Sequence, residues 1–296
     1  MDLQLSEARP ERVPPVRRVR RVRFRGHRII LFIVLLAVSV IIVFPMYWMI
    51  LSAVQPLAYS LEYSPPLFFK GFNTSPFVQL FTDHPMGLWL WNSTQLAVMV
   101  TAICFVLSLL GAYVLSHLKW KAKPAFGFFI LLTQMMPGAI IIVPVYRLYR
   151  NLHLINSLPA LAFVQAAFAL PICIWILKNV FDAIPGEVIE AALVEGCGSL
   201  SILWRILTPL SIPGLVAVGV VAFFFSWNEY LFASTLIIDS DSLPGSVGIA
   251  TLISELDAPI QLLLAAGIVF AVLPVFFYII VQRYVISGLT AGAVKG

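Results

Sequence analysis

Residues 181–214 read "FDAIPGEVIEAALVEGCGSLSILWRILTPLSIPG" and interrupt a chain that is otherwise strongly apolar. The stretch is too polar to cross a membrane, yet its apolar residues recur at helical spacing. Pro185 suits a first helical position, and Glu187 and Glu190 fall in the opening turns, where the helix dipole favours negative charge. We therefore expect a short helix with one apolar, small-residue face, formed by Ile189, Ala192, Leu193 and Gly196.

A second short helix is expected directly after the first. Gly196 and Gly198 break the first helix, and Ser199 is placed to cap the next one. Arg205 turns away from the apolar stripe of this second helix, which contains Ile202, Leu203, Ile206, Leu207 and Leu210. The pattern predicts a compact helix, turn and helix just below a membrane, shaped to dock into another protein.

The rest of the chain has the composition of an integral membrane protein. Of its 296 residues 60% are hydrophobic and 11% are charged, and the mean hydropathy is +0.96. A crossing of the hydrocarbon core needs about 20 apolar residues in a helix. The sequence offers about six such stretches, which predicts an all-α fold: Ile29–Leu51, Leu90–Leu115, Pro124–Tyr146, Leu158–Val180, Gly214–Ile238 and Leu262–Tyr284.

Positive charge is concentrated on one side of these spans. Residues 1–28 hold nine arginines against three acidic residues, and one face collects 16 of the 19 Lys and Arg residues. This imbalance places both termini and the interrupting stretch in the cytoplasm. The basic run directly precedes an apolar span, so anionic lipid headgroups explain it better than nucleic acid does.

These features give three expected segments. Residues 1–28 form a basic, disordered cytoplasmic tail; residues 29–286 form the transmembrane domain, with cytoplasmic helices at 185–210; residues 287–296 form a flexible C-terminal tail. Prolines inside the apolar runs, at 137, 144, 171 and 274, are expected to bend their helices.

The interrupting stretch resembles the cytoplasmic coupling motif of ATP-binding-cassette importer permeases. The matching residues are Glu190-Ala191-Ala192, then Gly196, continuing to the I-x-x-P-L-x-x-P pattern at 206–213. Glu195 stands where the family usually has Asp, and Cys197 where it often has Ala. The resemblance extends to "MMPGAIIIVPVYRLYRNLHLINS" (135–157), "FSWNEYLFA" (225–233) and "VISGLTAGAVKG" (285–296), which are similar to the smaller permease of the maltose-type carbohydrate uptake branch.

This resemblance implies a type I importer permease fold and a division of labour in a bacterial inner membrane. The sequence contains no G-x-x-x-x-G-K-[ST] phosphate loop, so ATP and Mg²⁺ are expected on partner subunits and no cofactor or metal on this chain. The implied partners are a homologous second permease, two ATP-binding-cassette subunits, an external solute-binding protein and membrane lipid, with no nucleic acid. The residues expected to couple to the ATPase are Glu187, Glu190, Ala191, Ala192, Glu195, Gly196 and Arg205. The alternative is an amphipathic helix that only rests on the membrane surface.

Polar residues within the apolar spans are candidates for a substrate path. An ionisable residue at membrane depth is a functional-site hypothesis, and neutral polar groups suit an uncharged polyol. The candidates are Trp227, Asn228, Glu229, Gln134 and Gln165. For each of them, a hydrogen bond between helices remains an alternative. The acidic outer loop with Asp239, Asp241, Glu255 and Asp257 is expected to contact the binding protein.

The sequence therefore predicts a non-enzymatic permease subunit of an ATP-driven, binding-protein-dependent importer of a sugar or sugar-like solute. An ion-coupled secondary transporter is the main alternative, and it would need coupling-ion sites or an inverted repeat, neither of which the sequence shows. An intramembrane enzyme is less compatible, because all four histidines lie in tails, loops or span ends.

Overall fold

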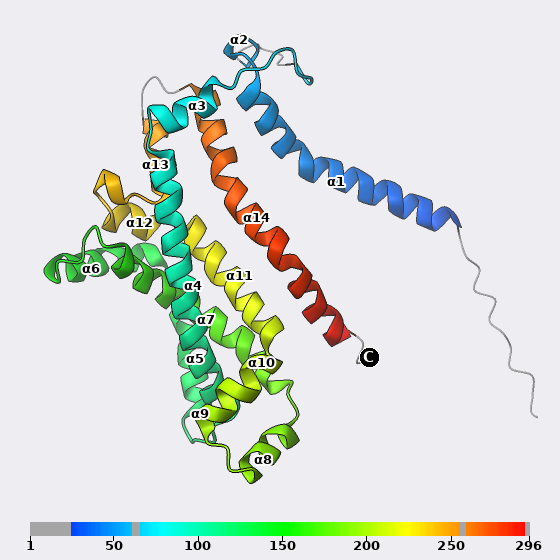
Figure 1. Cartoon of the computed structure of the whole chain (residues 1–296), viewed down its shortest axis with the longest axis vertical. Helices are drawn as coiled ribbons and strands as arrows, with labels where there is room; N and C mark the ends of the chain where they lie inside the picture. Colours follow the sequence, from blue (N-terminus) through cyan, green and yellow to red (C-terminus); the bar gives the residue numbers. More distant parts are fainter. Residues whose placement is uncertain (1–24, 61–65, 255–258, 294–296) are drawn as a thin grey trace, which may run out of the picture. The chain divides into compact units, whose positions relative to one another are not determined.

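The computed structural model describes residues 25–60, 66–254 and 259–293. The described residues form helices joined by turns and contain no strand (Figure 1). The chain divides into two units, residues 1–47 and 48–296, and each is described by itself. The expected basic tail lies outside the described residues up to residue 24.

Helix α1 (Arg25–Val54) supplies the described part of the first unit. Its 30 residues are long enough for the bilayer core at about 1.5 Å per residue. Large apolar side chains such as Ile29, Phe32 and Ile41 are all more than half exposed in this chain. Apolar exposure on all sides of residues 29–46 is typical of a lipid-facing span, whereas Leu51, Ala53 and Val54 at the end of the helix are buried.

The second unit contains the remaining helices. The long apolar ones are α4 (Met86–Ser116), α7 (Leu158–Asp182) and α14 (Ile260–Ala293). The shorter helices are α2 (Leu57–Ser60), α3 (Ser75–Thr82), α5 (Lys123–Thr133), α6 (Gly138–Asn151), α8 (Gly186–Val194), α9 (Ser199–Ile202), α10 (Thr208–Leu210), α11 (Ile212–Asn228), α12 (Leu231–Leu236) and α13 (Gly245–Ser254). A π-helical turn, η1 (Leu203–Leu207), joins α9 to α10, and a 3-10 turn, η2 (Ser240–Ser242), follows α12.

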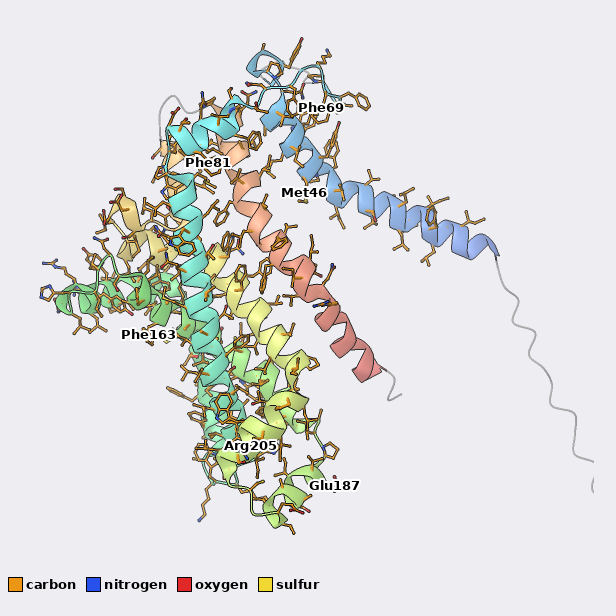
Figure 2. All side chains as sticks on the ribbon, viewed as in Figure 1. Met46, Phe69, Phe81, Phe163, Glu187 and Arg205 are labelled. Atoms are coloured by element: carbon orange, nitrogen blue, oxygen red, sulfur yellow. The ribbon has the colours of Figure 1, made fainter. Side chains whose placement is uncertain are left out.

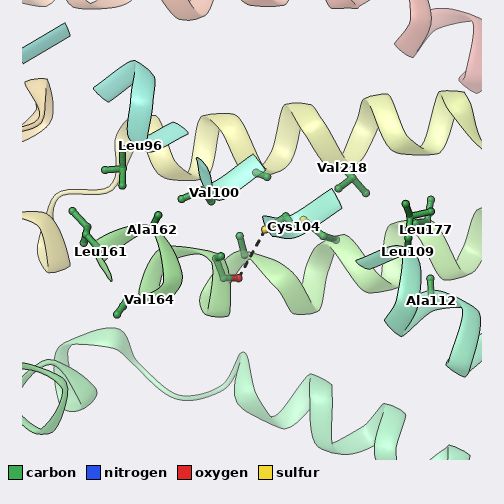
Figure 3. Close-up of a cluster of buried hydrophobic side chains, with 14 of the residues drawn as sticks. Leu96, Val100, Cys104, Leu109, Ala112, Leu161, Ala162, Val164, Leu177 and Val218 are labelled. Carbon is green, nitrogen blue, oxygen red and sulfur yellow. Dashed lines mark hydrogen bonds between the residues drawn. The ribbon is translucent and has the colours of Figure 1, made fainter. Parts of the chain in front are cut away.

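The core of the second unit lies where α4, α7 and α11 pack together (Figure 3). Close approach depends on small residues: a Cβ on Gly111 of α4 would lie 2.8 Å from Cδ1 of Ile174 on α7. Lipid tails are as apolar as the side chains, so close packing of this kind, rather than water exclusion, holds membrane helices together. Helix α14 packs against α11 and α3, and α6 packs beside α12.

The third expected span is not one helix. Helices α5 and α6 meet at a bend of 92° across Gln134–Pro137, and Pro137 is extended with ψ 129°. Proline has no N–H to continue the helix and restricts the residue before it, which explains the break. Pro144, Pro171 and Pro274 lie instead within helices that continue on both sides.

The fifth expected span is also divided. It begins as α11, which leaves α10 at a bend of 83°, and it stops at Asn228 before α12 begins at Leu231. Glu229 in the gap is extended, with ψ 126°. At the C-terminus, α14 continues to Ala293, so residues 287–293 extend the last helix and only 294–296 of the expected tail lie outside the described residues.

Candidate functional site

Helix α8 forms as the sequence predicts and ends in a defined turn. Pro185, expected as the first helical residue, is instead the N-cap, with ψ 135°, and Glu187 lies in the first turn. At the other end Gly196 adopts φ +79°, in the left-handed region that favours glycine. The N–H groups of Gly196 and Cys197 donate to the carbonyl oxygens of Leu193 and Ala192, at 3.0 and 2.9 Å. This pair of bonds is the Schellman arrangement, and it fixes the direction in which the chain leaves the helix.

One face of α8 packs against the core and the other is exposed. Ala192 is buried, and Ile189 packs against the same cluster. Four of the expected coupling residues are exposed on the helix and its C-cap: Glu187, Glu190, Ala191 and Glu195. Leu193 and Gly196 were expected on the inner face, but both are exposed, so that expectation was wrong for half of the stripe. The result is an outward face that combines carboxylates with small and apolar side chains, including Val194 at 88% exposure.

The segment after α8 anchors the turn to the core. Ile202, Leu203 and Leu207 are buried and Arg205 is exposed, as expected, whereas Leu210 is exposed. Ser199 does not cap this segment: the residue at the N-cap is Gly198, and no side-chain cap bond forms. Figure 2 shows Glu187 on α8 and Arg205 on the segment that follows, at the same end of the second unit.

A buried polar cluster surrounds the break between α11 and α12. The Glu229 carboxylate accepts hydrogen bonds from the backbone N–H groups of Phe232 (2.7 Å) and Ala233 (3.1 Å), so it caps the N-terminus of α12. It also accepts a bond from Nε2 of Gln165 on α7, at 3.0 Å. Gln165 is fully buried, and its Oε1 accepts from Ser226 Oγ at 2.7 Å. The structure thus brings together two of the expected path residues, Gln165 and Glu229.

The other expected path residues lie around this cluster. Gln134 is exposed in the break between α5 and α6, and its Nε2 donates to the Phe168 carbonyl, one turn of α7 beyond Gln165. Asn228 is exposed and donates to the Phe224 carbonyl. Trp227 is buried and stacks on Phe270, with ring centroids 4.8 Å apart.

The turn that contains η2 lies beside the N-terminal part of α4 and is fixed by side chains that the sequence analysis did not identify as functional. Asn92 is buried and its Nδ2 donates to the carbonyls of Asp241 (3.0 Å) and Leu243 (3.1 Å). Asn156, at φ +61°, accepts bonds from the N–H groups of Ile238 and Asp239. The turn holds Asp239 and Asp241 exposed, while Glu255 and Asp257 lie outside the described residues.

Known proteins resemble this chain in sequence and in fold. The model of the family described as "Binding-protein-dependent transport system inner membrane component" matches residues 105–290. The fold is similar to a crystal structure of a bacterial ABC transporter that imports the acidic polysaccharide alginate, with a TM-score of 0.75, 22% identity, and coverage of 88% of this chain and 98% of that chain.

Curated relatives are similar over almost their whole length. The "Sulfoquinovosyl glycerol transport system permease protein SmoH" of Agrobacterium fabrum is 32% identical over 88% of this chain and 93% of its own. The "Inner membrane ABC transporter permease protein YcjP" of Escherichia coli is 31% identical over 87% and 92%. The "Trehalose/maltose transport system permease protein MalG" of Thermococcus litoralis is 30% identical over 91% and 97%. The chain therefore belongs to the binding-protein-dependent transport system inner membrane component family and is a transmembrane permease subunit of an ABC importer.

Proposed function

We propose that this permease imports a sugar or sugar-like solute and that α8 is the surface through which separate ATP-binding subunits drive it. The observation that carries the proposal is the two-sided setting of α8: Ala192 and Ile189 fix its inner face, while Glu190, Ala191 and Glu195 remain exposed. Small side chains let a socket approach the helix backbone closely, and the carboxylates offer partners for cationic groups. A helix fixed to the core in this way can pass a push to α4, α7 and α11.

The partners follow from the family and from one related complex. A solved alginate transporter, with a TM-score of 0.67 to this chain, was crystallised with a periplasmic protein that carries an alginate pentasaccharide. By analogy, this chain pairs with a second permease, two ATP-binding subunits that hold ATP and Mg²⁺, and an external binding protein. The exposed Asp239 and Asp241 of the fixed turn are the proposed contact for the binding protein.

The proposed setting is a bacterial inner membrane with both termini in the cytoplasm. The support is the excess of Lys and Arg on the side that carries residues 1–28 and α8. In this orientation, residues 1–28 are a basic tail beside lipid headgroups and residues 29–286 form the permease domain.

The proposed substrate path runs beside the break between α11 and α12. Gln165 and Glu229 are tied to each other, so we assign them to the wall of the path, with Gln134 and Asn228 exposed nearby. Trp227 becomes available for stacking only if the ring contact with Phe270 opens. The sugar class is proposed from relatives whose names specify sulfoquinovosyl glycerol and trehalose or maltose transport.

Charge reversal on α8 tests the coupling role. The complex would be purified from membranes through a tag on this permease, with Glu190→Lys compared with Asp83→Lys, a matched reversal of an exposed acid beyond the end of α3. We expect Glu190→Lys to reduce both the recovery of ATP-binding subunits and ATP-driven uptake, while Asp83→Lys preserves them. Full recovery and uptake with Glu190→Lys would refute the coupling role, and uptake by the permease alone, driven by an ion gradient, would instead indicate a secondary transporter.

A further inference from the structure

The C-terminal ends of α4 and α7 meet in two neighbouring side-chain contacts. Ser116 Oγ donates to Asp182 Oδ1 at 2.5 Å. Beside this bond, the His117 ring stacks on the ring of the fully buried Phe181, with centroids 6.0 Å apart and an interplanar angle of 26°. We call Ser116, His117, Phe181 and Asp182 the clasp.

Two lysines join the clasp, and one of them belongs to a third helix. Lys123, the first residue of α5, donates from Nζ to the Ser116 carbonyl at 2.8 Å, where a cation also suits the C-terminus of α4. Lys178, one turn earlier on α7, pairs with Asp182 Oδ2 at 2.5 Å. The ends of α4, α5 and α7 are therefore joined through one serine and one carboxylate.

The local helix does not favour the Asp182 carboxylate. A negative charge at the C-terminus of α7 opposes the helix dipole, and a lysine followed by an acid four residues later is the weaker order for such a pair. The Asp182 side chain is 42% exposed in the pair, and solvent screening weakens an ion pair at such a position. The contact with Ser116 of α4, rather than the helix that Asp182 ends, therefore gives this carboxylate its place.

Asp182 also lies close along the chain to α8. Three residues, 183–185, separate it from the first residue of α8. Ile184 and Ile189 pack on the cluster that contains Phe181 and Ala192, so α8 and the end of α7 share one core. Residues 183–185 therefore give a displacement of α8 one route to the clasp, beside the route through the buried residues Ile202, Leu203 and Leu207 that follow α8.

We propose that Asp182 is a positioning residue for coupling: through Ser116 it keeps the end of α7 fixed to α4 and α5 while α8 is pushed. This inference rests on the proposed coupling role of α8. Without this hydrogen bond, α8 would still bind the ATP-binding subunits. Its displacement would then change the distance between α7 and α4 instead of moving α4, α5 and α7 together.

The experiment measures how widely the distance between the ends of α7 and α5 varies in the intact complex. Nitroxide labels would be attached to cysteines replacing Asn179 on α7 and Lys121 in the turn before α5, both exposed, in a Cys197→Ala background. Pulsed dipolar spectroscopy would give the label distance in lipid nanodiscs, without nucleotide and after trapping with MgATP and vanadate. The variants are Asp182→Ala, Ser116→Ala, their double mutant, and Asp83→Ala, an exposed acid bonded to its neighbour Thr82.

We expect one narrow distance in both states for the unmodified clasp and for Asp83→Ala. Asp182→Ala and Ser116→Ala should each broaden the distribution at least twofold, and the double mutant should broaden it no further, because both single changes remove the same bond. Wild-type widths in Asp182→Ala or in Ser116→Ala would overturn the proposal. Ser116→Ala removes only a hydroxyl, so the test stands even if the other variant folds poorly.

The same samples separate this inference from the coupling role of α8. None of the clasp substitutions changes α8, so the ATP-binding subunits should be recovered in full with every variant. Recovery that depends on Glu190 tests α8, whereas the distribution width tests the clasp.

Discussion

Gly196 gives the sharpest test of the coupling surface, because backbone strain and docking can be separated there. Its φ of +79° is costly for any residue with a Cβ, but among the described residues a Cβ at this place would meet no atom within 4 Å. Inside the permease, the cost of a substitution is therefore one of backbone conformation alone. Any cost that grows with side-chain volume must come from a partner.

The expected magnitudes follow from this geometry. A left-handed conformation costs an L-residue about 1–2 kcal/mol, and loss of glycine's freedom in the unfolded chain returns roughly 0.4–1 kcal/mol. Gly196→Ala should therefore lower the free energy of unfolding by about 1 kcal/mol, and Gly196→Asn by less, because asparagine tolerates this region. Gly196→Leu should resemble Gly196→Ala in the free permease, yet it should weaken binding of the ATP-binding subunits at least tenfold, or about 1.4 kcal/mol.

The assay compares Gly196→Asn and Gly196→Leu in purified permease pairs, with affinity for the ATP-binding subunits measured by titration in nanodiscs. Gly87→Leu is the matched control, since Gly87 on α4 is also exposed and an added Cβ there would meet no atom within 4 Å in the part of the chain that the structure describes. If Gly196→Leu binds the subunits as tightly as Gly196→Asn does, no socket approaches this turn, and the reasoning fails.

Three further changes test other parts of the structure. Glu229→Ala removes the carboxylate that caps α12 and leaves the buried Gln165 amide without its acceptor. The free energy of unfolding should therefore fall by roughly 2–3 kcal/mol in a denaturation assay, with Asn228→Ala as the nearby control. An unchanged unfolding midpoint would contradict the capping role. Asn92→Ala leaves the carbonyls of Asp241 and Leu243 without their donor. The rate of amide hydrogen exchange in residues 238–245 should therefore rise at least fivefold, which corresponds to about 1 kcal/mol in the free energy of local opening. An unchanged exchange rate would show that other contacts fix the turn. Burial lowers the pKa of His117, an effect opposed by the Asp182 carboxylate and assisted by Lys123. As the pH falls, His117 is therefore protonated in the unfolded chain before it is protonated in the folded one. The free energy of unfolding should decrease as the pH drops through and below about 6.5, and this decrease should be smaller in His117→Phe. Identical pH profiles for the two proteins would refute this role of His117.

Much of the fold could be predicted because a bilayer imposes length and composition on every crossing. Helices α1, α4, α7 and α14 were each expected within a few residues at their starts, and α8 was predicted from Pro185, the glutamates and Gly196. Hydropathy records how apolar a segment is but not the direction of the helix axis. In the sequence analysis, α5 and α6 were therefore treated as one span, and α11 and α12 as another. Both breaks are signalled locally, by Pro137 and by an acid at Glu229, but only tertiary contacts decide between a bend and a break.

The candidate sites were predictable in residue type and less so in contacts. Glu229 and Gln165 stand out as polar groups in apolar runs, yet their mutual bond joins residues 64 apart in sequence. The role of Asn92 was not predicted, because the two carbonyls that accept its bonds lie 149 and 151 residues away in the sequence. The inner face of α8 was predicted only in part, since Leu193 is rotated about 100° around the helix from the buried Ala192 and faces outward.

The π-helical turn at Leu203–Leu207, closed by a bond from Thr208 Oγ1 to the Leu203 carbonyl, has a consequence for aligning this chain with its relatives. A π turn holds one more residue than an α turn, so a relative with an unbroken helix here fits the same length with one residue fewer. Deleting a single residue within 203–207 would rotate the following segment by about 100° relative to α9. Roles should therefore be transferred across this turn by the direction in which side chains point, and a gap of one residue in the alignment is the expected mark of its loss.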